Sequence, residues 1–160
     1  MRRPPDETVT FTPEEPSPAL AQMDRLAAAH RGWINFVPDV REEDMPDPPV
    51  GLASLLAGTV HDIPVGTWVP GKLTRGGVEC DTLGLQHNAG TRTAARLRTL
   101  GVAVPDGWRP EQDHPRRGLV VRVAAGAGHA DQLAWLLEAA AALSTVRLTG
   151  TWQATVRLGR

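Results

Sequence analysis

The stretch "GLVVRVAAGAGHADQLAWLLEAAAALSTVRLTGTWQATVRL", residues 118–158, decides the fold class of this chain. It opens with an apolar strand at residues 118–124 and continues as a helix rich in alanine and leucine at residues 130–143. Residues 151–158 then alternate polar and apolar side chains without an error, which is typical of a strand with one buried face. This order of strand, helix and strand predicts a sheet whose buried face packs against helices.

The rest of the chain carries shorter helix and strand signals, interrupted by glycine and proline. Because helix and strand signals follow one another irregularly rather than in strict alternation, they favour an α+β two-layer domain. We expect a mixed sheet of about four to six short strands, with about three helices on one face. The expected elements are a helix over 17–30, a short strand at 34–37, a helical turn around 52–56, two or three strands within 60–87 with turns at 70–71 and 76–77, and a helix at 91–100.

The length of 160 residues suits one domain with one core. Nine of the 14 prolines fall within the first fifty residues, so residues 1–16 are expected to form a flexible tail rich in proline and glutamate. At most, a short strand forms at residues 8–11. Residues 17–160 then constitute the single α+β domain.

The single cysteine, Cys80, excludes an intramolecular disulfide framework and is typical of a reducing compartment. No apolar run approaches the roughly 18 residues that a membrane span requires. We therefore expect a cytoplasmic protein without membrane association. The histidines and Cys80 show no metal-ligand spacing, so neither a metal site nor a cofactor is predicted.

Charge is divided unevenly along the chain. Residues 1–62 hold eleven Asp and Glu against five Arg, whereas residues 63–160 hold seven Asp and Glu against eleven Arg and Lys72. This division indicates either an acidic segment lying on a basic face or a basic face kept for an anionic partner. The sequence leaves both interpretations open.

The segment "DHPRRG", residues 113–118, places three kinds of reactive or charged side chain together. His114 would exchange protons near neutral pH, Asp113 would orient it, and Arg116 with Arg117 would hold a carboxylate or phosphate. The alternative is a plain turn, because successive side chains of an extended chain point in opposite directions. We favour the turn.

A catalytic site at this segment would need further groups from elsewhere in the fold. His87 and Asn88 lie at the end of an expected strand and ahead of a helix, so they are the preferred partners. Trp108 and Arg109 lie in an expected loop, where an indole either closes the edge of the core or lines a ligand pocket. Both interpretations of Trp108 stay open.

The segment "HNAGTRTAARLRTLGV", residues 87–102, resembles the hairpin and second helix of the helix-hairpin-helix nucleic-acid-binding motif. Gly90 falls at the second hairpin glycine of that motif, and Leu97, Leu100 and Gly101 match its helix and stop. The resemblance implies that hairpin amides and basic side chains contact a phosphate backbone. However, residues 77–86 are expected to form a strand where the motif has its first helix, which argues against a nucleic-acid partner.

The helix expected at residues 130–143 has two apolar faces at a step of 100° per residue. A leucine stripe faces the sheet, whereas Trp135, Ala139 and Ala142 lie on the face that should be solvated. Lone domains seldom expose such a face. It predicts a homodimer through these three residues, or a cover formed by Val9 and Phe11 of the tail.

No residue set supplies a complete nucleophile, base and orienting group. The leading hypothesis is a binding or interaction protein for an anionic small molecule or a protein partner, with Arg116, Arg117, Asn88, Trp108 and Arg109 as ligand-binding candidates. The alternative is a small enzyme that acts on a phosphate or carboxylate substrate with His87 or His114. A second alternative is nucleic-acid binding through residues 87–102.

Overall fold

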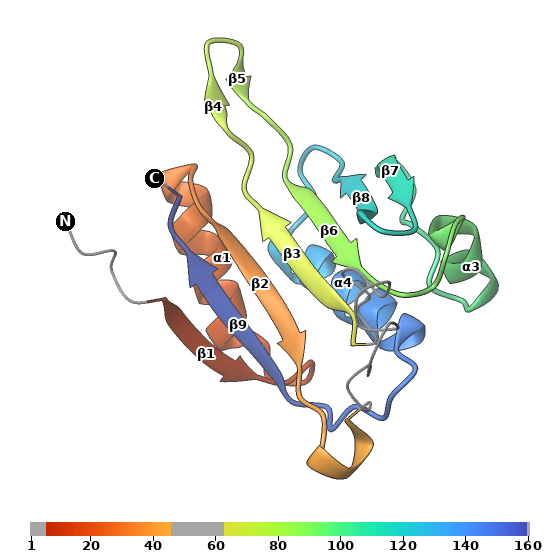
Figure 1. Cartoon of the computed structure of the whole chain (residues 1–160). Helices are drawn as coiled ribbons and strands as arrows, with labels where there is room; N and C mark the ends of the chain where they lie inside the picture. The colour runs from red at the N-terminus through yellow and green to blue at the C-terminus, as the bar shows by residue number, and fades with distance from the viewer. Residues whose placement is uncertain (1–5, 46–62, 160) are drawn as a thin grey trace.

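The computed structural model describes residues 6–45 and 63–159 (Figure 1). The helical turn expected around residues 52–56 lies outside the described residues. The elements are, in order, β1 (Glu7–Phe11), α1 (Ser17–Ala29), β2 (Trp33–Pro38), the 3-10 helix η1 (Glu42–Asp44), β3 (Val65–Val69), β4 (Leu73–Thr74), β5 (Gly77–Val78), β6 (Thr82–Gln86), α3 (Thr93–Thr99), β7 (Arg109–His114), β8 (Gly118–Arg122), α4 (His129–Leu143) and β9 (Trp152–Arg157).

Seven strands form one sheet in the order β1-β9-β2-β3-β6-β8-β7, while β4 and β5 pair separately. Every neighbouring pair among the described strands is antiparallel. The α+β class is confirmed, but the expected mixed sheet of four to six strands is wrong. Helix α1 joins β1 to β2, but β9 lies between these two strands in the sheet. Helix α3 joins β6 to β7, and β8 lies between them in the same way. As a result, no two parallel strands are neighbours.

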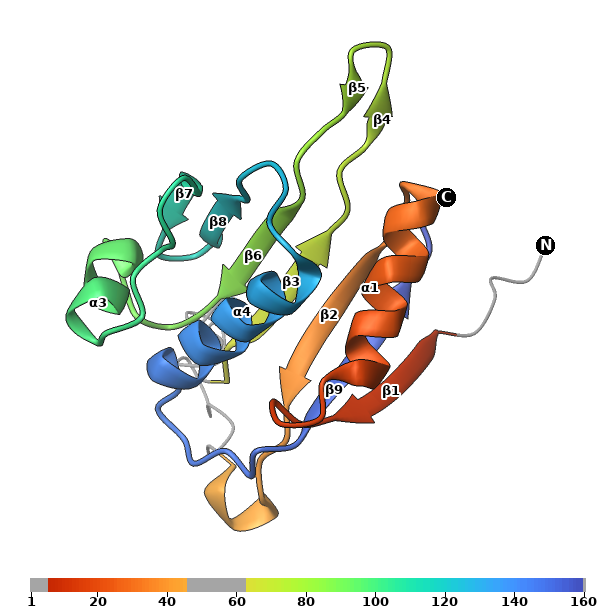
Figure 2. The same cartoon turned by 180° about the vertical axis from the view of Figure 1, so that it is seen from behind.

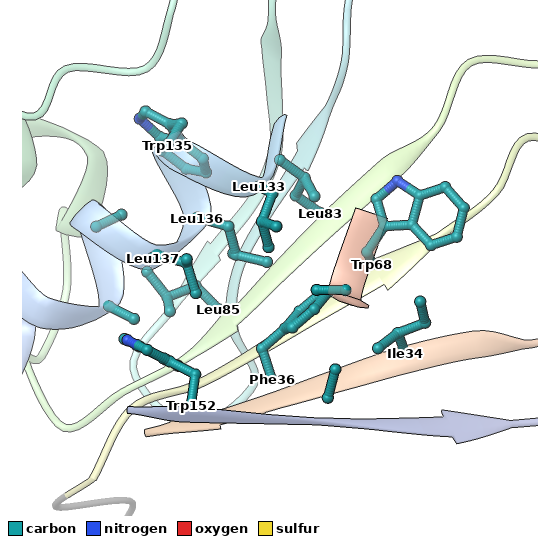
Figure 3. Close-up of a cluster of buried hydrophobic side chains, with 14 of the residues drawn as sticks. Ile34, Phe36, Trp68, Leu83, Leu85, Leu133, Trp135, Leu136, Leu137 and Trp152 are labelled. Atoms are coloured by element: carbon teal, nitrogen blue, oxygen red, sulfur yellow. The ribbon is translucent and has the colours of Figure 1, made fainter. Parts of the chain in front are cut away.

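The core lies between the sheet and the two longer helices. Figure 2 shows α1 and α4 in front of the same face of the sheet, with α3 beside the β7 edge. Strand residues alternate, so that β2 buries Ile34 and Phe36 and leaves Asn35 on the other face. Figure 3 shows the α4 leucines against these strand side chains. The expected leucine stripe of α4 is buried throughout and consists of Leu133, Leu136, Leu137, Ala140 and Leu143.

Trp135 does not lie on a solvated face. Its side chain points away from the sheet (Figure 3) but is only 6% exposed, because the segment between α3 and β7 covers it. Its indole N–H donates to Ala103 O at 3.0 Å, and its ring meets Trp108 edge to face at 5.7 Å. Ala139 is fully buried as well. The premise that Trp135 and Ala139 form an exposed dimer surface is therefore wrong, and Ala142 alone is only partly buried.

The short strand that the sequence allows at residues 8–11 of the expected tail is confirmed. Residues 7–11 form β1, the edge strand beside β9, with Phe11 opposite Trp152. Phe11 packs edge to face on Phe36 at 6.0 Å rather than on Trp135, so the expected tail cover of Trp135 is wrong as well. A strand forms here despite the many prolines, because β9 supplies its hydrogen bonds and the core buries Phe11.

Strands β4 and β5 form an arm that projects beyond the seven-stranded sheet (Figure 1). The turn expected at residues 76–77 does close this arm, at residues 75–76, whereas residues 70–71 do not form a turn. Gly71 is required there for another reason, because a Cβ atom at this position would lie 1.7 Å from Glu79 O. The Gly71 N–H donates to Asp81 Oδ1 at 2.8 Å, which fixes the base of the arm.

Candidate functional site

Residues 115–117 form the turn that connects β7 to β8. His114 Nδ1 accepts hydrogen bonds from the backbone N–H groups of Arg116 and Arg117 at 3.1 and 3.2 Å. The ring therefore stabilises the turn, and both arginine side chains are exposed. Asp113 and His114 follow each other in an extended strand, and the Asp113 carboxylate is engaged elsewhere. The four candidate side chains consequently do not converge on one substrate position.

Asp113 acts on the N-terminus of α3. Its carboxylate oxygens accept hydrogen bonds from the N–H groups of Thr93 and Ala94, both at 3.0 Å. Arg92, which precedes the helix, has a left-handed backbone (φ 58°) and supplies no side-chain cap. A carboxylate from β7 therefore takes the place of the local cap and ties α3 to the edge of the sheet.

His87 is buried beside the same helix end and is hydrogen-bonded through both ring nitrogens. Nδ1 accepts from the Ala89 N–H at 3.0 Å, and Nε2 lies 3.0 Å from Thr93 Oγ1. A neutral ring with its proton on Nε2 satisfies both contacts, and the Thr93 hydroxyl then donates to Gly90 O at 3.5 Å. Because neither nitrogen keeps a free lone pair, His87 stabilises the loop rather than serving as a general base.

Burial lowers the pKa of His87 below its ordinary value of 6.5. The Asp113 carboxylate opposes this shift, and the Arg96 guanidinium adds to it. The folded protein thus holds His87 neutral near neutral pH. The sequence linked His87 to Asp113 as possible catalytic partners, and the structure does bring both to Thr93, in a structural role.

The neutral state of His87 predicts a pH dependence of stability. The contribution of neutral His87 to the free energy of unfolding is fully present above about pH 6.5. It declines as the pH falls through the lowered pKa of the folded state, because the unfolded chain binds the proton more readily. We expect the stability advantage of the wild type over His87→Gln to shrink between about pH 7 and about pH 5. Urea unfolding of both proteins across this range measures it, and a difference that stays constant with pH would contradict a neutral, hydrogen-bonded His87.

The remaining ligand-binding candidates are dispersed. Arg109 begins β7, about 16 Å of extended strand from its far end, where the Arg116 and Arg117 turn lies. Asn88 is exposed in the loop before α3. Trp108 lines a hollow of about 220 Å³ together with Arg98 and Asp106, so charges of both signs face this space. No single basic site for an anionic ligand is assembled from these residues.

A polar network that the sequence analysis did not single out connects α1, α4 and the sheet. Gln132, which is 1% exposed, accepts from Trp68 Nε1 at 2.8 Å and donates to Asp81 Oδ2 and Ala127 O, both at 3.0 Å. His129 Nδ1 lies 2.6 Å from Asp24 Oδ1, and its Nε2 lies 3.5 Å from Asp81 Oδ2. The only sequence signal was a glutamine within the apolar part of a helix. These contacts hold α1, α4 and the sheet together.

An apolar groove runs along α4 and has a volume of about 370 Å³. We call it the α1–α4 groove, because the loop that leads into α1 forms one wall. Its α4 residues are Ala130, Leu133, Ala134, Leu137, Glu138 and Ala141. The other residues that line it are Pro13, Pro16, Leu148, Gly150 and Trp152. Glu138 is the single charged residue of this lining within residues 6–45 and 63–159.

Trp152 places a hydrogen-bond donor at the groove. Figure 3 shows the nitrogen end of its indole turned toward α4. Among the described residues, no acceptor receives this N–H, and the only fully buried unpaired polar side-chain atom is Gln22 Oε1. Trp152 is only 2% exposed, and the α1–α4 groove is the cavity that its indole lines. Apolar walls with one donor and one carboxylate are suited to binding rather than to catalysis.

No family model, curated protein or solved structure matches this chain. Within residues 6–45 and 63–159, no three His, Cys, Asp or Glu side chains gather as metal ligands. None of the helices in these two ranges has the length and apolar character needed to cross a bilayer.

The helix-hairpin-helix resemblance is not supported by the structure. Residues 82–86 form strand β6 at the place where the motif has its first helix. Gly90 does adopt a positive φ of 79°, yet the helix that follows has only seven residues. Its first two N–H groups, of Thr93 and Ala94, are occupied by Asp113, so they are not free to hold a phosphate.

Proposed function

We propose that this chain is a protein-binding domain whose α1–α4 groove receives apolar side chains of a partner. The observation that carries this proposal is the groove itself, with a floor of Leu133, Leu137 and Trp152 and walls of alanine and proline. Its volume of about 370 Å³ lies in the range of pockets that bind ligands. Monomeric domains rarely leave a contiguous apolar surface exposed to water unless it binds a partner or ligand.

The chemistry of the lining favours an apolar partner over an anionic small molecule. No arginine or lysine among the described residues lines the groove, and Glu138 would repel an anion. The Trp152 N–H offers a hydrogen bond to a backbone carbonyl, which a peptide segment brings with its side chains. The enzymatic alternative has less support, since His87 uses both ring nitrogens to hold Ala89 and Thr93, and His114 uses its Nδ1 to hold the turn.

Binding of the neutral apolar dye N-phenyl-1-naphthylamine tests the groove. At submicromolar protein concentration, we expect the wild type to bind the dye and Ala134→Trp to bind it at least about tenfold more weakly, equivalent to about 1.4 kcal/mol. The added indole would fill the space that the dye needs. Dye fluorescence measures affinity, and the Trp152 indole N–H resonance, assigned with Trp152→Phe, reports the location.

Ala95→Trp is the matched control, because Ala95 is exposed on α3 and does not line the groove. It should bind the dye as the wild type does. If the wild type binds no dye, or if Ala134→Trp binds it equally well while the Trp152 resonance stays unmoved, the groove is not the binding surface.

A further inference from the structure

The β4–β5 arm, residues 70–80, presents an apolar surface to solvent. Leu73 and Val78 are cross-strand neighbours, and they are 67% and 59% exposed. No other large apolar side chain in the described part of the chain is as exposed. An isolated two-stranded hairpin is marginally stable in water. An apolar pair held on such a hairpin is therefore a surface that a partner would cover.

The base of the arm is fixed, although its tip is free. Gly71 N–H donates to Asp81 Oδ1, Glu79 N–H donates to Lys72 O at 2.9 Å, and His30 Nδ1 lies 3.1 Å from Gly71 O. The first two contacts join the two sides of the arm, and the His30 contact ties the arm to the C-terminal end of α1. The arm is thus held in an extended position before any partner binds, which reduces the entropy that binding would cost.

The arm and the α1–α4 groove of one chain face different directions. The arm is tied to the end of α1, whereas Pro13 and Pro16 of the groove precede its start, about 20 Å away along a helix of 13 residues. Figures 1 and 2 both show the arm pointing away from the helices. The apolar pair of one chain therefore fits the groove of a second chain, not its own.

The two surfaces are complementary in character and in charge. The groove is apolar, as is the Leu73–Val78 pair. Lys72, Arg75 and Glu79 flank the pair, which leaves the arm with a net positive charge, while Glu138 lines the groove and Glu14 and Glu15 lie between its two prolines. Opposite charges at the rim would steer the arm and fix its orientation.

Building on the proposed function of the groove, we propose that its partner is the arm of a second copy of this chain. Leu73 and Val78 of each copy occupy the groove of the other, and a two-fold axis relates the two contacts. Each copy carries one arm and one groove, so this reciprocal exchange uses every binding surface and closes the assembly at a dimer. The dimer predicted from the sequence would thus form through the arm rather than through Trp135.

Sedimentation equilibrium at tens of micromolar tests the exchange. We expect a dimer for the wild type. Leu73→Thr with Val78→Thr should raise the dissociation constant at least about hundredfold, because both arms lose their apolar contacts at once. Threonine keeps the strand propensity of the arm. Leu100→Thr, which alters an exposed leucine on the α3 side, should stay a dimer. A monomeric wild type, a dimer that both arm substitutions leave intact, or an open-ended polymer would overturn the proposal.

A mixed disulfide identifies the contact directly. In a Cys80→Ser background, one chain carries Arg75→Cys and the other carries Glu138→Cys. We expect covalent dimers joined between positions 75 and 138 in the mixture, formed faster than the dimers of either chain alone. Equal rates in all three samples would contradict the exchange. This test stays informative if the doubly substituted arm does not fold.

The dye separates failure of the exchange from failure of the groove. At tens of micromolar, the double arm variant should bind N-phenyl-1-naphthylamine better than the wild type does, because its groove is no longer occupied. Equal binding by both proteins, with a monomeric wild type, would overturn the exchange and leave the groove as a binding surface. Absence of binding by both, in dilute solution as well, would overturn the groove proposal.

Discussion

Replacing Gln132 with leucine is expected to lower the free energy of unfolding by about 3–5 kcal/mol. Leucine has a similar size, so a cavity is not the cause. The substitution leaves the buried Trp68 N–H without an acceptor and removes one donor from the Asp81 carboxylate. Each buried group left unsatisfied costs about 1–3 kcal/mol. Urea unfolding followed by tryptophan fluorescence, at a fixed protein concentration, measures the loss.

Gln153→Leu is the matched control for this prediction. Gln153 is exposed on β9, so its replacement should change the free energy of unfolding by no more than about 0.5 kcal/mol. A loss below about 1 kcal/mol for Gln132→Leu would mean that water or a rearranged side chain satisfies Trp68 and Asp81. The network would then not join the sheet to α4.

Gly118→Ala is the second substitution for which we expect a loss of about 3–5 kcal/mol. Gly118 begins β8 with φ +83°, a conformation that costs other residues about 1–2 kcal/mol. In addition, a Cβ atom there would lie 2.4 Å from Leu85 O in the backbone of β6. Since β6 is held by strands on both sides, it cannot yield without breaking its pairing with β8.

Gly126→Ala separates the two causes. Gly126 has a similar φ of +81°, but a Cβ atom there would meet no atom within 4 Å. We therefore expect only the conformational cost, about 1–2 kcal/mol. The difference between the two variants in urea unfolding reports the clash with β6. Equal losses would show that β6 and β8 separate easily at this point.

The sequence determined the elements that have a strong local pattern. The leucine stripe of α4 and the alternation of β9 each indicate one buried face, and both are buried as expected. The position of β2 and the turn that closes the β4–β5 arm also follow from local residue preferences. These predictions succeed because each depends on residues a few positions apart, whose backbone geometry fixes which side chains share a face.

Only the tertiary structure decided which partner covers each face. A helical period marks Trp135 as apolar but does not reveal that the segment ahead of β7 lies over it. Likewise, Asp113 caps a helix that begins 20 residues earlier, and His87 uses both ring nitrogens in that same corner. A motif in the sequence shows which groups are present, whereas their hydrogen bonds depend on which strands become neighbours.

The α1–α4 groove shows the same limit. Its walls come from residues 13–16, 130–141 and 148–152, which meet only because β9 inserts between β1 and β2. No local pattern predicts that insertion, since the strand order depends on contacts between segments that lie far apart in the sequence. The sequence by itself thus determined which residues could be buried. The tertiary structure decided which apolar surface stays open. Only the packing of all the described residues together shows which apolar side chains no other segment covers.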